Sequence, residues 1–221
     1  LVKKCLNKFH KLCINNNIYM MIIMSLPFVI IDIATRLWAY DLEFYSIFSL
    51  APRLFSLAYI ILFVGICYNI NSKHSHIIYN LIFAICFIIF VVNGVYYSST
   101  NNYFDMIMLG LAGEGSAYFV DALKNCNIWV YIVSLILIIY IALLQKHYPS
   151  NLKFNKKGIL IIVLVFISLH FIAKLSLGKA NFELTWDTWR VPRNIYNNFN
   201  DSRKCMAISR FYEYPVRNFY I

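Results

Sequence analysis

The stretch GILIIVLVFISLHFIAKLSL, residues 158–177, decides the fold of this chain. It is a run of 20 residues in which His170 and Lys174 are the only ionisable side chains. That length matches what an α-helix needs to cross the hydrocarbon core of a bilayer. Because the apolar residues are continuous rather than alternating, the run predicts a membrane-spanning helix and not a strand of a barrel. Lys174 lies near the end and can extend to the interface, whereas His170 either makes a helix-packing hydrogen bond or has a proton or lipid contact.

The composition of the whole chain fits the same class of protein. Of its 221 residues 61% are hydrophobic and 14% are charged, and the mean hydropathy is +0.63. We therefore predict an all-α polytopic membrane protein with five transmembrane helices, followed by short amphipathic interfacial helices. Residues 1–177 are the expected five-span domain, and residues 178–221 are an expected extracellular juxtamembrane linker. The expected spans are about 18–34, 54–70, 77–95, 128–144 and 158–177.

The lysines predict the orientation in the membrane. The lead before the first span and the turns after the second and fourth spans carry lysines and no acid, whereas residues 98–126 carry three acids and one Lys. Positive segments stay in the cytoplasm, so we expect a cytoplasmic amino terminus and, after five spans, an extracellular carboxy terminus. The tail from Gly178 onward is mildly basic, with seven Lys or Arg against four acids, but long translocated segments follow the rule poorly. The excess of Ile, Asn and Lys is typical of AT-rich genomes and favours a bacterial cell membrane.

Two charged residues close the first span. Asp32 and Arg36 are four residues apart, which puts them on one helix face within reach of each other. They are either a neutralised pair at the water interface or a contact for a lipid head group.

The tail after the fifth span has aromatic and apolar residues at helical spacing on both sides of Pro192. This pattern predicts two short amphipathic helices at the membrane surface. Arg190 and Arg193 would meet anionic phosphates on the polar side, unless the tail is an anchoring belt with no specific ligand. The aromatic and apolar residues are Phe182, Trp186 and Trp189 before the proline, and Ile195, Tyr196 and Phe199 after it.

No cofactor or metal site is expected in this chain. Its six cysteines form no CxxC pair, and His74 and His76 have no carboxylate or cysteine beside them. The segment GEGS, residues 113–116, lacks the preceding strand and the Lys of a phosphate-binding loop. No nucleic-acid partner is expected, and the oligomeric state is open.

The order TWDTWRVPRNIYNNFNDSRK (185–204), then YEYPVRN (212–218), after five spans and a basic lead, resembles the lipoteichoic acid synthase family. The stretch VNGVYYSSTNNYFDMIMLG (92–110) is also similar to that family, although Ser98 and Ser99 replace bulkier or basic residues. The resemblance covers most of the chain in architecture. Its specific part is the last forty or so residues and the Asp32–Arg36 turn.

The resemblance implies a role in cell wall biogenesis. Members of that sulfatase family are transferases that move phosphoglycerol from phosphatidylglycerol, with an extracellular catalytic domain that has a threonine nucleophile and manganese or another divalent metal. None of that domain is in this chain, so no catalytic or metal-binding residue is carried over, and the chain alone is expected to be truncated and inactive. Only the anchoring role carries over. The implied partners are membrane lipids, phosphatidylglycerol among them. The candidate head-group contacts are Asp32, Arg36, Trp186, Trp189, Arg190 and Arg193.

Two alternatives stay open at this point. A phosphoethanolamine transferase membrane domain shares the five-span plan and would also precede a sulfatase-like domain. A free-standing multi-pass protein, such as a small transporter or an accessory subunit, would usually show inverted repeats and paired charges near the midplane of the membrane. We see no repeat in the sequence, and its charged residues lie near span ends.

Overall fold

A computed structural model describes residues 17–37, 49–105, 119–181, 190–199 and 201–220. Within these ranges the chain is all-helical and contains no strand. Five helices are long and apolar enough to cross a membrane, which confirms the all-α class and indicates a multi-pass membrane protein. These five are α2 (Asn17–Leu37), α3 (Leu50–Tyr68), α4 (Ser72–Thr100), α7 (Ile128–Lys146) and α8 (Lys156–Ser176). The shorter or later helices are α6 (Phe119–Lys124), α9 (Pro192–Asn198) and α10 (Ser202–Tyr220).

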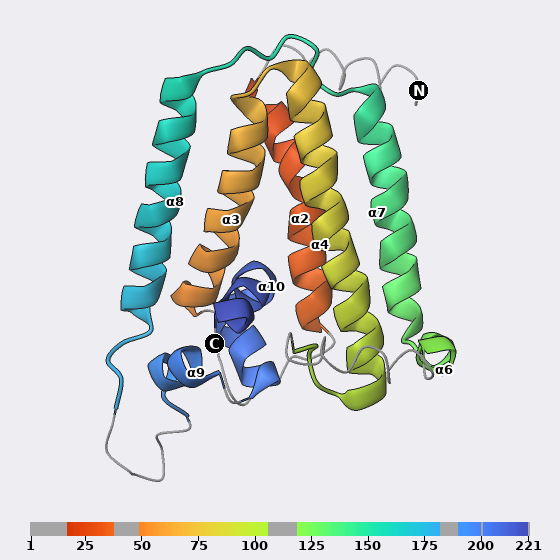
Figure 1. Cartoon of the computed structure of the whole chain (residues 1–221), viewed down its shortest axis with the longest axis vertical. Helices are drawn as coiled ribbons and strands as arrows, with labels where there is room; N and C mark the ends of the chain where they lie inside the picture. Colours follow the sequence, from red (N-terminus) through yellow and green to blue (C-terminus); the bar gives the residue numbers. More distant parts are fainter. Residues whose placement is uncertain (1–16, 38–48, 106–118, 182–189, 200, 221) are drawn as a thin grey trace.

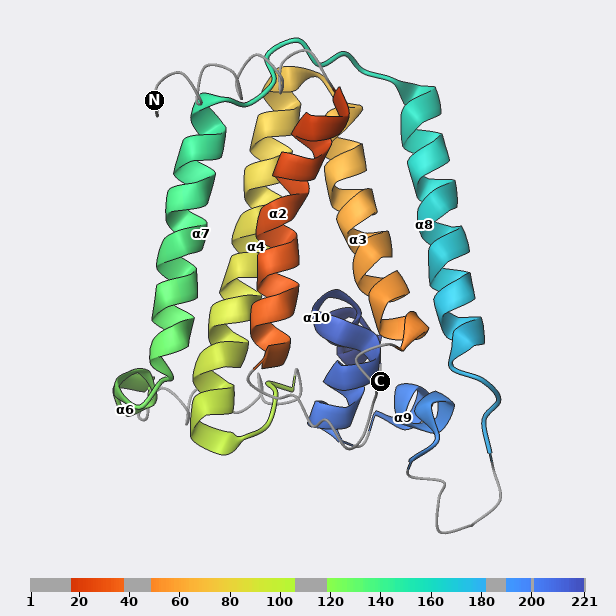
Figure 2. The same ribbon diagram turned by 180° about the vertical axis from the view of Figure 1, so that it is seen from behind.

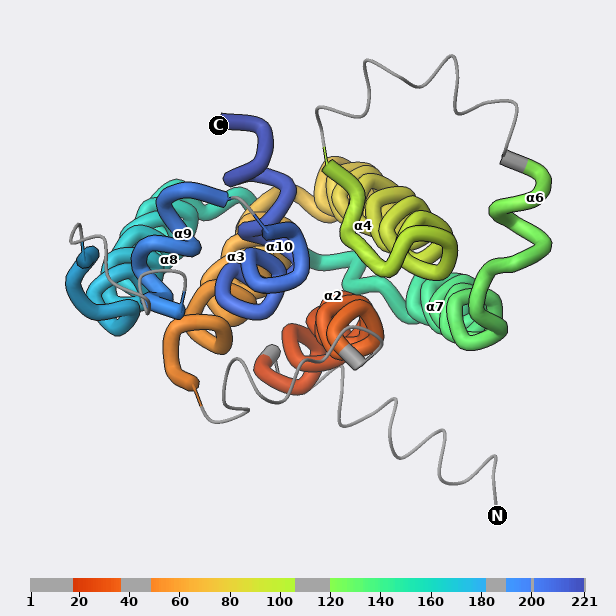
Figure 3. The backbone as a smooth tube through the Cα atoms, turned by 90° about the horizontal axis from the view of Figure 1, so that it is seen from below, coloured from red at the N-terminus to blue at the C-terminus, as the bar shows by residue number. Residues whose placement is uncertain are grey.

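The spans form a row rather than a closed ring. Helices α2, α3 and α4 pack on one another in the middle, α7 packs on α2 and α4, and α8 packs on α3 (Figures 1 and 3). The outward faces of α7 and α8 are rich in exposed leucine and isoleucine, as expected where lipid is the solvent. Capping amides fix where these two helices begin: Asn127 accepts a hydrogen bond from the backbone of Trp129, and Asn155 accepts one from Gly158.

Two glycines allow α3 and α8 to approach closely. A Cβ atom at Gly65 would collide with the side chain of Ile162, and one at Gly158 would collide with the side chain of Asn69. Small residues serve this purpose between membrane helices because they let the backbones come together.

We predict that Gly65→Leu separates α8 from α3. The added side chain overpacks the contact with Ile162, which we expect to cost about 1–3 kcal/mol of unfolding free energy. Detergent-solubilised protein titrated with a denaturing detergent gives the measurement. Adding Ile162→Ala to Gly65→Leu should recover much of the loss; a double variant no more stable than Gly65→Leu would show that this contact does not set the spacing.

The two lysine-bearing turns lie together at one end of the bundle. The backbone N–H of Ser72 donates to the carbonyl of Leu152 (3.3 Å), and that of Asn155 donates to the carbonyl of Asn69 (2.9 Å). Helices α6, α9 and α10 all lie at the opposite end, which we call the α10 end (Figure 2). The basic turns are thus at one end of the bundle, and Asp105 and Asp121, the described acids between α4 and α7, follow and precede helix ends at the other.

Helix α10 is built into the bundle and does not lie on it as a surface helix would. It enters the space between the ends of α2 and α3 and packs on both (Figures 1 and 2). The spans cover both its apolar face and part of its polar face, and they supply partners for its polar side chains. Its buried residues are Cys205, Met206, Ile208, Ser209, Phe211, Tyr212, Glu213, Tyr214 and Asn218.

Candidate functional site

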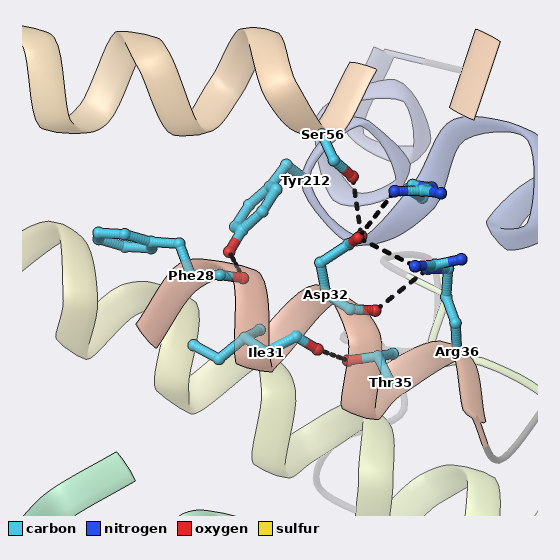
Figure 4. Close-up of polar contacts among 8 residues, drawn as sticks. Phe28, Ile31, Asp32, Thr35, Arg36, Ser56 and Tyr212 are labelled. Carbon is cyan, nitrogen blue, oxygen red and sulfur yellow. Dashed lines mark hydrogen bonds and ion pairs between the residues drawn. The ribbon is translucent and has the colours of Figure 1, made fainter. Parts of the chain in front are cut away.

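The first cluster at the α10 end centres on Asp32, whose side chain is 4% exposed. Its Oδ2 atom lies 3.1 Å from Nη1 of Arg210 and 3.4 Å from Nη2 of Arg36. The hydroxyl of Ser56 donates a hydrogen bond of 2.8 Å to Oδ1 (Figure 4). The carboxylate therefore ties the end of α2 to α3 and to α10, and it is shared between two arginines.

Arg210 holds an unusual backbone conformation to reach Asp32. Its φ of 61° and ψ of −178° interrupt α10 in a region that favours glycine. Such a conformation costs on the order of 1–3 kcal/mol and persists only where surrounding contacts impose it. Burial lowers the pKa of the Arg210 guanidinium to about 10, although Asp32 favours the charged form. The guanidinium is therefore cationic at neutral pH, and its ion pair with Asp32 stabilises the strained turn.

The second cluster centres on Glu213, which is 3% exposed. The hydroxyl of Tyr59 in α3 donates to its Oε2 atom (2.8 Å), and the hydroxyl of Tyr196 in α9 donates to Oε1. Nδ1 of His170 in α8 lies 3.7 Å from Oε2, beyond hydrogen-bond distance. Burial and the neighbouring Glu213 carboxylate raise the pKa of Tyr196, so this phenol remains a hydrogen-bond donor. One buried carboxylate of α10 thus binds α3 and α9 by hydrogen bonds and lies close to α8.

Further hydrogen bonds to backbone carbonyls hold the same assembly. The Tyr212 hydroxyl donates to the carbonyl of Phe28 (2.6 Å), as Figure 4 shows. The Tyr103 hydroxyl donates to the carbonyl of Thr35 (2.8 Å), next to the end of α2. The guanidinium of Arg217 lies 4.8 Å from the centre of the Tyr196 ring and donates to the carbonyl of that residue. Tail and spans therefore share a polar interior in addition to an apolar one.

The structure places the residues singled out from the sequence in different settings. Asp32 and Arg36 do pair, but the pair is buried around the Asp32 carboxylate and recruits Arg210. Arg193 is half-buried and donates from Nη1 to the carbonyl of Lys174 at the end of α8 (2.7 Å). Arg190 is exposed. Trp186 and Trp189 lie outside the described residues.

Sequence reasoning missed Arg210, Glu213 and Tyr59. An acid inside an aromatic segment was the available signal for Glu213, since FYEY puts it among three aromatic neighbours. Arg210 directly precedes that segment. The partner of Glu213 in α3 could not be found this way, because a tyrosine in a span is ordinarily read as a packing or interface residue.

The site holds charged side chains at the end of an apolar helix bundle. The two carboxylates are enclosed, and the side chain of Arg36 keeps 21% of its surface exposed. No group of three or more metal-ligating side chains occurs in the part of the chain that the structure describes. The arrangement suits docking of the tail and contact with an anionic group at its edge.

The reactivity of the Cys205 thiol tests whether α10 is docked on the spans. Burial raises the pKa of its thiol to about 12, so both access and thiolate formation are suppressed. We expect Cys205 to resist N-ethylmaleimide at pH 8 in nanodiscs, whereas a cysteine at exposed Arg203 on the same helix (Arg203→Cys) reacts readily. Peptide mass mapping distinguishes the two sites; equal labelling of both would contradict the packing of α10.

Comparison with protein-family models, with curated proteins and with solved structures gives no match to this chain.

Proposed function

We propose that this chain is the membrane module of a cell-surface phosphoglycerol transferase of the lipoteichoic acid synthase type. In this proposal it anchors the enzyme in a bacterial cell membrane, with the amino terminus in the cytoplasm and the α10 end outside. It also holds the exit segment in one orientation, so that a catalytic domain beyond it would face the membrane. The resemblance of residues 185–204 and 212–218 supplies the family, and the structure supplies the supporting observation described next.

That observation is the docking of α10 by two buried carboxylates. A flexible tether would need no internal polar contacts with the spans. Here Asp32 pairs with Arg210, and Glu213 accepts hydrogen bonds from Tyr59 and Tyr196. Breaking a buried ion pair by removing one partner is costly, so the tail is held firmly. A module that fixes the direction in which its tail leaves the membrane matches the supporting role proposed.

A lipid head-group contact fits the edge of this site. Arg36 is partly exposed at the end of α2, and Arg190 is exposed before α9. Guanidinium groups pair well with phosphate oxygens. The phosphate of phosphatidylglycerol is the partner we propose for them, with Asp32 positioning Arg36 from inside.

The orientation is tested with fusions in a bacterial host. Alkaline phosphatase matures only outside the cytoplasm, so a fusion after Ile221 should be active and one inserted after Asn71 should be inactive. The opposite pattern would overturn the assignment of the α10 end to the outside.

The function is tested by joining this chain to the catalytic domain of a lipoteichoic acid synthase and supplying fluorescent phosphatidylglycerol in vesicles. We expect turnover by the chimera to exceed that by the free catalytic domain, and no turnover by the chain alone. Equal turnover by chimera and free domain would remove the orienting role. Turnover by the chain alone would show a catalytic activity that the proposal excludes. Preference for phosphatidylethanolamine when the catalytic domain is exchanged for that of a phosphoethanolamine transferase would favour the related alternative.

A free-standing transporter is the second candidate. The approach of His170 to Glu213 favours it, because titratable groups inside a membrane bundle often mark proton pathways. Proteoliposomes loaded with a pH-sensitive dye test this candidate. Acidification that depends on both His170 and Glu213 would support transport, and its absence would leave the anchoring proposal.

A further inference from the structure

A hollow of about 320 Å³ lies between α4 and the last turns of α10, apart from both carboxylate clusters. Its size is at the lower end of ligand pockets. Its wall is almost entirely apolar. The lining residues are Ile88, Ile89, Val92 and Asn93 of α4, Phe104 after α4, and Tyr214, Pro215 and Asn218 of α10.

The mouth of the hollow faces the hydrocarbon of the membrane. Ile88 is 60% exposed and Val92 is 38% exposed on a span helix, so their outer surfaces contact lipid. The opposite wall is enclosed, since Tyr214 is 1% exposed. Lipid is the solvent at this position, and an unfilled hollow would lose dispersion contacts along its whole lining. The alkyl chain of a lipid has the shape and the low polarity that fit this hollow.

The wall of the hollow becomes polar toward the α10 end. Asn93 lies more than one turn beyond Ile88 along α4, in the direction of the α10 end, and Asn218 lies across from it on α10. Asn93 is engaged, because its Oδ1 accepts from the backbone of Phe104 (3.2 Å) and its Nδ2 donates to the carbonyl of Ile89 (2.9 Å). The Tyr214 hydroxyl is buried and interacts with the side chain of Asn218.

From this lining we propose that the hollow holds one acyl chain of a glycerophospholipid, with the ester carbonyl at the Tyr214 and Asn218 end. The apolar walls take up the chain. The head group then lies at the α10 end of the bundle. This inference rests on the position of the hollow in a membrane bundle and is independent of the transferase proposal, so either can fail alone.

The test compares two tryptophan substitutions on α4. The full chain is reconstituted in nanodiscs of phosphatidylglycerol and phosphatidylcholine, extracted in mild detergent and weighed by native mass spectrometry. We expect the unmodified protein to retain one phospholipid of either kind. Val92→Trp fills the hollow and should lower this occupancy at least tenfold. Ile85→Trp is the matched control, because Ile85 is exposed on the same helix and does not line the hollow.

A further variant keeps the proposal open to refutation. Ile88→Trp is the second test, in case Val92→Trp does not fold. Its side chain lies at the mouth of the hollow, where it can turn toward lipid. It should also lower the lipid occupancy. The proposal is overturned by absence of a retained lipid in the unmodified protein. Equal occupancy in Ile88→Trp and Ile85→Trp would overturn it as well.

Discussion

Replacing Asp32 with leucine is expected to destabilise the bundle by about 3–5 kcal/mol, the usual cost of removing one partner from a buried ion pair. Arg210 would lose the carboxylate 3.1 Å away, with its side chain 11% exposed and little access to water. The strained backbone at Arg210 would also lose the contact that imposes it. Unfolding of the protein in mixed micelles, followed by circular dichroism during titration with a denaturing detergent, measures the change.

The double variant Asp32→Leu with Arg210→Leu separates the ion pair from the packing. Because an apolar replacement for both partners of a buried pair is often neutral or stabilising, we expect it to be more stable than Asp32→Leu alone. Asp121→Asn is the matched control, since Asp121 pairs with Lys124 at a site where both side chains are more than 70% exposed. Surface pairs of this kind contribute about 0–1 kcal/mol. A loss in Asp121→Asn as large as that in Asp32→Leu would contradict this account.

Glu213→Ala is expected to release α10 and α9 from the spans. The hydroxyls of Tyr59 and Tyr196 would lose their common acceptor, and a buried donor left unsatisfied costs about 1–3 kcal/mol. Cys205, eight residues earlier on α10, should then become reactive toward N-ethylmaleimide at pH 8. Labelling rates in nanodiscs give the measurement.

Glu213→Gln is the conservative comparison. The amide retains one oxygen that accepts from one tyrosine, so protection of Cys205 should fall between that of the unmodified protein and that of Glu213→Ala. If Cys205 stays unreactive in Glu213→Ala, then apolar packing alone holds α10, and the carboxylate has a different purpose.

The spans were predictable because hydropathy alone specifies them. Long apolar runs must be helical in lipid, and α2, α3, α4, α7 and α8 begin and end within about five residues of the expected bounds. The pairing of Asp32 with Arg36 followed from their spacing of four residues. Nothing beyond local periodicity was needed for either.

The position of α10 was not predictable in the same way. The spacing on both sides of Pro192 predicted helices only as far as Phe199, so α10 (Ser202–Tyr220) was not among them. Periodicity also does not say whether the partner of an amphipathic helix is lipid or protein. The position of α10 depends on two contacts between residues far apart in the sequence: Asp32 with Arg210, and Tyr59 with Glu213. Read locally, Asp32 pairs with Arg36 and Tyr59 is a packing or interface residue, and only the fold shows that they meet Arg210 and Glu213. The conformation of Arg210 gives no local signal either, since glycine is what that backbone usually requires.

The central claim is that α10 lies inside the bundle, and photo-crosslinking from Met206 tests it most directly. Met206 is 1% exposed and belongs to the cluster of α3, α8 and α9 residues that includes Phe55, Ala173 and Tyr196. Photo-methionine changes the side chain little, and its products in nanodiscs can be assigned by mass spectrometry of the α10 peptide. We expect crosslinks from Met206 to peptides of α3 or α8. Adducts of Met206 with phospholipid alone would place α10 on the membrane surface and contradict the account.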